Sequence, residues 1–136
     1  MTIKKLSIPV LIFALVGCLT VKEIKDFSKM NKFTPVAESY AKVIQWSDFE
    51  AASFYAKNPK SKPDLDKLKN IKVISYEVKR ITHQKEQLKV LQSIALSYYI
   101  RDQLKEKSLR YQEVWEYDEM DGSWYLTSGL PAFEWE

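Results

Sequence analysis

The sequence predicts an α+β domain in which N-terminal helices pack on a curved antiparallel sheet of about four strands. Apolar residues between positions 34 and 57 recur at the helical period, whereas those between 71 and 126 alternate with a period of two. Asp121-Gly122 is a hairpin signal near the end of the chain. Helices followed by a run of antiparallel strands are typical of α+β folds, and 136 residues allow one such domain.

The helical part is predicted in three pieces. Thr34-Pro35 starts the first helix, because a hydroxyl N-cap followed by proline favours a helix start. Its apolar face consists of Val36, Tyr40, Val43 and Ile44. The capping box Ser47-Asp48-Phe49-Glu50 begins a second helix, and residues 58–63 are rich in loop formers. Residues 64–70 add a short helical turn, for which Asp64 and Asp66 supply N-terminal charge.

Three strands and a hairpin follow. We expect strands over residues 71–81, 88–100 and 109–118, and the second has the clearest alternation. One side of that strand carries Leu88, Val90, Gln92, Ile94, Leu96, Tyr98 and Ile100. A two-residue loop at Asp121-Gly122 would pair Tyr117 with Leu126, and Trp115 with Ser128. This register predicts one shared face, formed by Tyr111, Glu113, Trp115, Tyr117, Trp124 and Leu126.

The composition excludes several classes of site. The chain has one cysteine, one histidine and three glycines, so an intrachain disulfide, a Cys/His zinc cage and a glycine-rich nucleotide loop are not expected. His83 is interpreted as a solvated residue of the turn after the first strand. The net charge is only +3, without an arginine-rich stripe, which argues against binding of nucleic acid. We predict no metal and no cofactor.

The first 18 residues predict an export signal. Lys4 and Lys5 precede the apolar run Leu6–Val16, which is shorter than the roughly 20 residues that span a bilayer. The run ends in Leu15-Val16-Gly17-Cys18, which resembles the lipobox of bacterial lipoproteins. The resemblance implies cleavage before Cys18 and acylation of Cys18, since two or more acyl chains make a stable anchor. The predicted membrane partner is therefore the lipid bilayer.

The same resemblance implies a location and a layout. In lipoproteins of Gram-negative bacteria, aspartate after the lipidated cysteine signals retention in the inner membrane. Leu19 at this position implies the periplasmic face of the outer membrane, whereas a Gram-positive source would imply the outer face of the plasma membrane. We expect a signal peptide over 1–17, a lipidated cysteine and tether over 18–33, and the domain over 34–136. Lysines in the tether would either contact anionic head groups or remain solvated.

Two stretches resemble the NTF2-like domains of the cystatin-like superfamily. The first is residues 41–52, where an apolar helix ends in a polar break before Asp48-Phe49-Glu50-Ala51-Ala52. The second is the last hairpin, which consists of Val114-Trp115-Glu116-Tyr117 and Asp121-Gly122-Ser123-Trp124-Tyr125-Leu126. The resemblance covers residues 34–133 and implies a cone of helices and curved sheet that encloses a pocket. Family members include exported accessory domains, subunits of secretion machines and small enzymes, so the fold alone does not give the function.

Glu113 is the one candidate catalytic residue. The predicted register places it on the aromatic face between Tyr111 and Trp115, where desolvation would raise its pKa and suit a general acid or base. Tyr98 or Tyr111 would assist it. The alternative is a carboxylate that is solvated or paired with an arginine, for which the candidates are Arg80, Arg101 and Arg110.

An aromatic set, with Glu113 among it, either lines a ligand pocket or forms the core. The pocket-lining candidates are Trp46, Tyr98, Tyr111, Glu113, Trp115, Tyr117 and Trp124, with Tyr99 beside Tyr98. The long strand 88–100 would also suit a homodimer formed through the sheet. We favour a membrane-anchored lipoprotein without catalysis, which binds an envelope protein or a small apolar ligand. The alternatives are a small pocket enzyme that uses Glu113 and an accessory subunit of a secretion or envelope machine.

Overall fold

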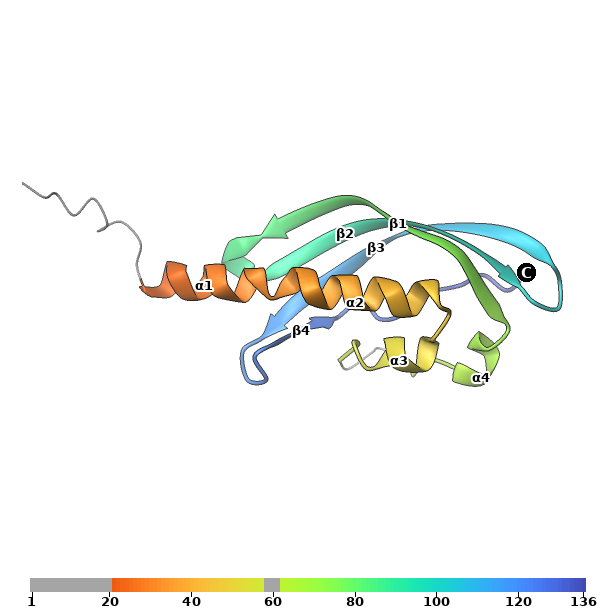
Figure 1. Cartoon of the computed structure of the whole chain (residues 1–136), viewed down its shortest axis with the longest axis horizontal. Helices are drawn as coiled ribbons and strands as arrows, with labels where there is room; N and C mark the ends of the chain where they lie inside the picture. The colour runs from red at the N-terminus through yellow and green to blue at the C-terminus, as the bar shows by residue number, and fades with distance from the viewer. Residues whose placement is uncertain (1–20, 58–61) are drawn as a thin grey trace, which may run out of the picture.

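The structure is a computed structural model that describes residues 21–57 and 62–136, with side chains described from Ile24 onward. It confirms the predicted α+β class, with N-terminal helices packed on a four-stranded antiparallel sheet (Figure 1). The strands follow one another in the order β1-β2-β3-β4. The elements are α1 (Val21–Asn31), α2 (Phe33–Gln45), α3 (Phe49–Ser53), α4 (Leu65–Leu68), β1 (Ile71–Gln84), η2 (Lys85–Gln87), β2 (Lys89–Ile100), β3 (Lys105–Asp118) and β4 (Ser123–Leu126).

Helices α1 and α2 follow one another (Figure 1), and Lys32 lies between the end of α1 and the start of α2. Pro35 explains the break, because it has no N–H to donate to the carbonyl of Asn31 and its ring would clash with that carbonyl. Helix α2 begins at Phe33 rather than at Thr34. The tether that we expected over 18–33 is therefore helical over 21–31. Its last residue, Phe33, is buried in the core.

Ser47 and Asp48 of the predicted capping box accept hydrogen bonds from two different parts of the chain. Asp48 is the N-cap of α3 and accepts a hydrogen bond of 3.1 Å from the N–H of Ala51. Ser47 has a left-handed φ of 59°, and its hydroxyl accepts a 2.8 Å hydrogen bond from the N–H of Val73. Asp64 caps α4 in the same way as Asp48 caps α3, which confirms the predicted short turn.

The alternation of inward and outward side chains along β1 shifts by one residue at two places. Register shifts between Val73 and Ser75, and again between Val78 and Arg80, insert extra residues opposite the regular strand β2. The inward side chains are therefore Ile71, Val73, Tyr76, Val78, Ile81 and His83, read from their partners on β2. The strand continues past residue 81, so His83 lies in β1 and not in a turn.

Strand β2 confirms the predicted alternation. Its burial pattern alternates from Lys89 to Ile100, with Val90, Ile94 and the other inward side chains in the core. Because β1 and β3 pair with its two edges, β2 has no free edge for a second copy of the chain. The outermost strands of the described sheet are β1 and β4.

The last hairpin has a longer loop than predicted. Trp115 pairs with Leu126 and Tyr117 with Trp124, two residues away from the predicted register. The Asp118 carboxylate accepts hydrogen bonds from the N–H groups of Met120 and Asp121, at 2.8 and 3.1 Å, and so closes a loop over 119–122. A shift of two residues leaves the faces unchanged, and the predicted shared face is therefore confirmed.

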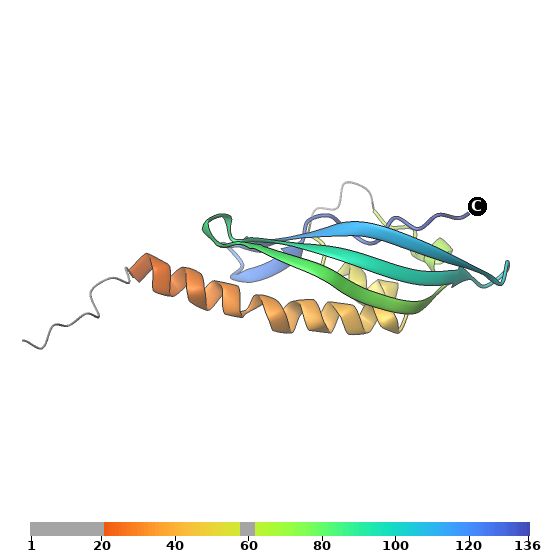
Figure 2. The ribbon, with the colours of Figure 1, turned by 90° about the horizontal axis from the view of Figure 1, so that it is seen from above.

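The inner face of the sheet is filled by side chains. Phe33 from α2 stands edge-on to Trp115 and Trp124, with ring centroids at 5.8 and 5.3 Å. At the other end of the core, Phe133 packs against Tyr98 with ring centroids at 4.8 Å. Figure 2 shows the long strands running side by side along α2, with the C-terminal segment returning beside them. Aromatic packing thus occupies the space that the resemblance assigns to a pocket.

Candidate functional site

Glu113 lies at the centre of a buried hydrogen-bond cluster. Alternation along β3 turns its side chain inward between Tyr111 and Trp115, and none of its surface is exposed. One carboxylate oxygen, Oε1, accepts hydrogen bonds from the hydroxyls of Tyr76 at 2.7 Å and Tyr111 at 3.2 Å. The other, Oε2, accepts one from the indole N–H of Trp115 at 3.1 Å. Two hydroxyls and an indole, not an arginine, therefore satisfy this carboxylate.

Helix α2 closes the cluster from the side opposite the sheet. Tyr40 is fully buried, and its ring lies edge-on to Trp115 at 5.3 Å and to Tyr76 at 6.4 Å. Its hydroxyl has no hydrogen-bond partner among the described residues. Aromatic rings thus surround the Glu113 carboxylate and keep bulk water away from it.

Burial dominates the electrostatics of this cluster. Desolvation raises the pKa of Glu113, and the hydrogen bonds from Tyr76, Trp115 and Tyr111 oppose that rise. Desolvation also raises the pKa values of Tyr40, Tyr76 and Tyr111, and the nearby charge of Glu113 raises them further. All three tyrosines therefore remain protonated at any physiological pH, and Tyr76 and Tyr111 donate their protons to hydrogen bonds with Glu113.

A general acid or base must reach a bound substrate. The acceptor oxygens of Glu113 are already engaged, and its side chain has no exposed surface. Three surface hollows stand out in residues 21–57 and 62–136, and Glu113 lines none of them. The geometry therefore suits a residue that ties β1 and β3 together beneath α2.

The structure separates the other candidate residues. Tyr111 and Trp115 touch Glu113, and Tyr117 packs with Trp124 at 5.6 Å beyond them. Trp46 caps the end of α2 with 79% of its surface exposed, so it lines no interior pocket.

Tyr98 is too far from Glu113 to assist it. Gln92 pairs with Glu113, and Tyr98 lies six residues further along β2, about 20 Å at the rise of a strand. Its hydroxyl instead donates to the carbonyl of Glu134 and accepts from the N–H of Glu134, both at 2.9 Å. Tyr99 belongs to the opposite face, since it is the next residue along the strand.

Sequence reasoning missed Tyr76 and Phe33 as members of the aromatic interior. Tyr76 turns inward only because of the first bulge in β1. Phe33 was assigned to the tether, although a large aromatic just before a helical apolar face is a signal that the helix extends further. His83 is exposed, and its ring lies edge-on to Phe33 at 6.3 Å. Among the described residues, no cluster of three or more His, Cys, Asp or Glu is placed to hold a metal ion.

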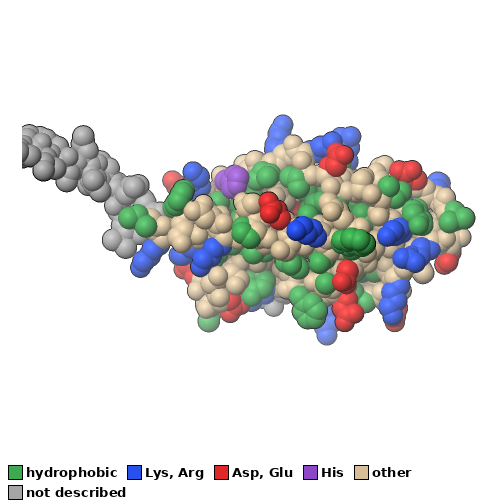
Figure 3. Space-filling model, viewed as in Figure 1, with side chains coloured by type: hydrophobic (Ala, Val, Ile, Leu, Met, Phe, Trp, Pro, Cys, Tyr) green, Lys and Arg blue, Asp and Glu red, His purple; other side chains and the backbone are tan. Residues whose placement is uncertain are grey.

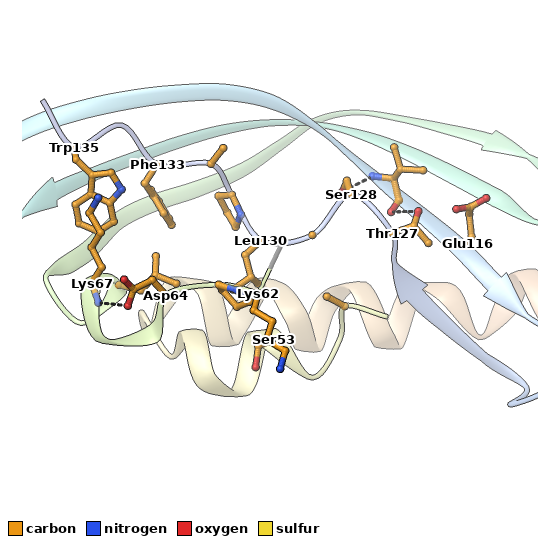
Figure 4. A pocket seen from close by; sticks show the side chains of 17 residues that line it. Ser53, Lys62, Asp64, Lys67, Glu116, Thr127, Ser128, Leu130, Phe133 and Trp135 are labelled. Carbon is orange, nitrogen blue, oxygen red and sulfur yellow. Dashed lines mark hydrogen bonds between the residues drawn. The ribbon is translucent and has the colours of Figure 1, made fainter. Parts of the chain in front are cut away.

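Two of the hollows are large, and both lie on the surface. One has a volume of about 870 Å³ and separates α3 and α4 from the C-terminal segment (Figure 4). Lys67 and Trp135 stand at its end in a cation–π contact of 4.5 Å. The other, of about 900 Å³, lies between α1 and the tip of the β1–β2 hairpin. Neither hollow is lined by Glu113, Tyr111 or Trp115.

Comparison with known proteins assigns the chain to no family. No family model, curated protein or solved structure matches the chain. Within the residues that the structure describes, no helix is long and apolar enough to cross a membrane. Cys18 and the other lipobox residues lie outside the described residues.

Proposed function

We propose that the chain is an exported lipoprotein of the bacterial cell envelope, anchored through Cys18. The support is the order of features in the first 18 residues: two lysines, an apolar run and Leu15-Val16-Gly17-Cys18. Acylation would also give the single cysteine a use. For a Gram-negative source, Leu19 favours the periplasmic face of the outer membrane.

We further propose that the domain is a binding or assembly module without catalysis. The filled interior carries this proposal, because a pocket enzyme needs a cavity and Glu113 lies in none of the large hollows. Exposed apolar side chains instead point outward, among them Trp46 and Phe54. A module that acts through its surface makes use of such residues.

A relation to the NTF2-like domains is also a proposal. It is supported by the order of elements, helices before an antiparallel meander, and by the Asp121-Gly122 hairpin with Trp124 turned into the core. The packed interior differs from the open pocket that this family implies. That difference favours the accessory type of member over the enzymatic type.

Metabolic labelling tests the anchor. The full chain, expressed in a Gram-negative host with radioactive palmitate, should carry the label and fractionate with the outer membrane. The Cys18→Ser variant should lose the label and accumulate as an uncleaved precursor. Equal labelling of both chains, or none in the wild type, would exclude the proposed anchor.

The indole N–H of Trp115 tests the filled interior. Its NMR signal should stay in place when small apolar compounds are added, because the ring is fully buried and hydrogen-bonded to Glu113. The indole signal of the exposed Trp46 reports non-specific contacts. Saturable movement of the Trp115 signal alone would reveal an interior ligand site and reverse the proposal.

A further inference from the structure

The first helix leaves two large apolar side chains in water. Ile24 is 56% exposed and Phe27 is 67% exposed, three residues apart on α1. Both line the hollow of about 900 Å³, together with Met30 and with His83 and Lys85 at the hairpin tip. Figure 3 shows apolar side chains on this end of the molecule, near the histidine. An exposed apolar patch of this kind is typical of a surface that contacts an apolar partner.

The chain places this patch close to Cys18. Two residues lie between Cys18 and Val21, where α1 begins, so the gap spans at most about 11 Å. Ile24 and Phe27 then follow at about 4.5 and 9 Å along the helix axis. Polar head groups occupy roughly 5–8 Å on each side of a bilayer. If Cys18 is acylated, Ile24 and Phe27 lie at most about 15 and 20 Å from the anchored cysteine, so the patch is within reach of the head groups.

The charges around the patch nearly cancel. The lysines nearby are Lys25, Lys29, Lys32 and Lys85, and the carboxylates are Asp26, Glu86 and Glu119. Lys29 is paired with Glu119 at 3.1 Å. A net excess of one positive charge attracts a polyanion only weakly. Apolar contact therefore has to supply the attraction, and the nearest apolar phase is the membrane that holds the anchor.

We propose that the patch formed by Ile24, Phe27 and Met30 inserts into the head-group region of the bilayer. The inference rests on the anchor proposed above and adds an orientation to it. The domain would stand with α1 and the β1–β2 hairpin tip against the membrane, and with α3 and α4 away from it. Exposed aromatic and aliphatic side chains beside lysines are typical of helices that lie at a membrane interface.

A nitroxide spin label tests the orientation. Acylation consumes the sulfur of Cys18, so Phe27→Cys gives the lipidated full chain a single free thiol. The label is attached to this thiol in vesicles that contain one fifth anionic phospholipid. Phe54→Cys is the matched control, since Phe54 is 78% exposed and lies at the end of α3. Ile24→Cys is the second test site. Lipidated wild type should take up no label, because its only cysteine is acylated. This control tests the anchor independently of the orientation.

The label at residue 27 should collide more with oxygen than with a water-soluble nickel chelate, as it does inside a membrane. The label at residue 54 should show the opposite preference. Raising the salt concentration from 0.1 to 1 M should change neither result, because the contact is apolar. A water-like result at both 24 and 27, while the protein still floats with the vesicles, would overturn the inference and leave the anchor intact. Protection of residue 27 from both reagents would show that a second protein copy covers the patch instead.

Discussion

The Tyr76 hydroxyl on β1 donates a 2.7 Å hydrogen bond to the Glu113 carboxylate on β3, across the intervening strand β2. This bond joins the edge strand to the interior of the sheet through side chains alone. Glu113 also accepts from Tyr111 and Trp115, so one carboxylate organises three aromatic residues. We interpret Glu113 as a structural centre, and the first two predictions test that role.

Removing the carboxylate should destabilise the fold. Glu113→Ala leaves the hydroxyls of Tyr76 and Tyr111 and the indole of Trp115 without an acceptor, which we expect to cost about 3–5 kcal/mol. Glu113→Gln keeps one acceptor oxygen and should cost about 1–2 kcal/mol. Urea unfolding measures both. Glu116→Gln is the control, since Glu116 is 44% exposed and pairs loosely with Lys89 at 3.7 Å. Equal effects of Glu113→Ala and Glu116→Gln would refute the structural role.

Stability should also depend on pH through Glu113. Burial raises its pKa above the ordinary value of 4.5, so the folded chain keeps a proton that the unfolded chain has already released. Glu113 therefore adds stability that is fully present below pH 4.5 and is lost as the pH rises through the raised pKa. The difference in unfolding free energy between wild type and Glu113→Gln should fall across this window. A difference that is constant with pH would contradict the raised pKa.

Lys57 should hold the last hairpin in place. Its ammonium contacts the carboxylates of Asp118 and Asp121, and the distance to Asp121 is 2.8 Å. These contacts lower the pKa values of both aspartates, so their stabilising effect is present above pH 3.8 and is lost as the pH falls through the lowered pKa values. We expect Lys57→Gln to speed amide hydrogen exchange over 117–126. Lys69→Gln, which removes an exposed contact with Asp66, should leave that exchange unchanged.

Tyr98 should fasten the C-terminal segment. Its hydroxyl makes two hydrogen bonds with the backbone of Glu134, and its ring packs on Phe133. Tyr98→Phe keeps the ring and should cost about 1–2 kcal/mol, mostly by releasing residues 133–136. Faster exchange of the Glu134 amide is the direct readout. Tyr99→Phe, on the other face of β2, should have no such effect, and matching changes in both variants would disprove the contact.

Sequence patterns predicted the fold class because α2 has a clear helical apolar face and β2 alternates without interruption. The exact start of the helix and the length of the hairpin loop differ from the prediction. The helix that we expected to start at Thr34 begins at Phe33 and follows another helix, α1, and the side chain of Asp118 lengthens the hairpin loop. The longer loop did not alter which side chains of the hairpin face the core, since a shift of two residues keeps every side chain on its face.

The candidate site was only partly predictable. The inward position of Glu113 follows from the alternation of β3, but its partner Tyr76 depends on a bulge in β1 that alternation does not reveal. Whether the aromatic residues line a pocket or fill it depends on the packing of α2, which brings Phe33 and Tyr40 onto Trp115. A sequence pattern gives the face of a residue and does not give what packs against that face.

The most direct test of the account is the mass of the N-terminal peptide of the mature protein, purified from membranes of a bacterial host. We predict a peptide that begins at Cys18 and carries a diacylglycerol thioether and an acylated amine. A chain that begins at Met1, or one cleaved elsewhere with a free Cys18 thiol, would contradict the proposed lipoprotein and the orientation that rests on it.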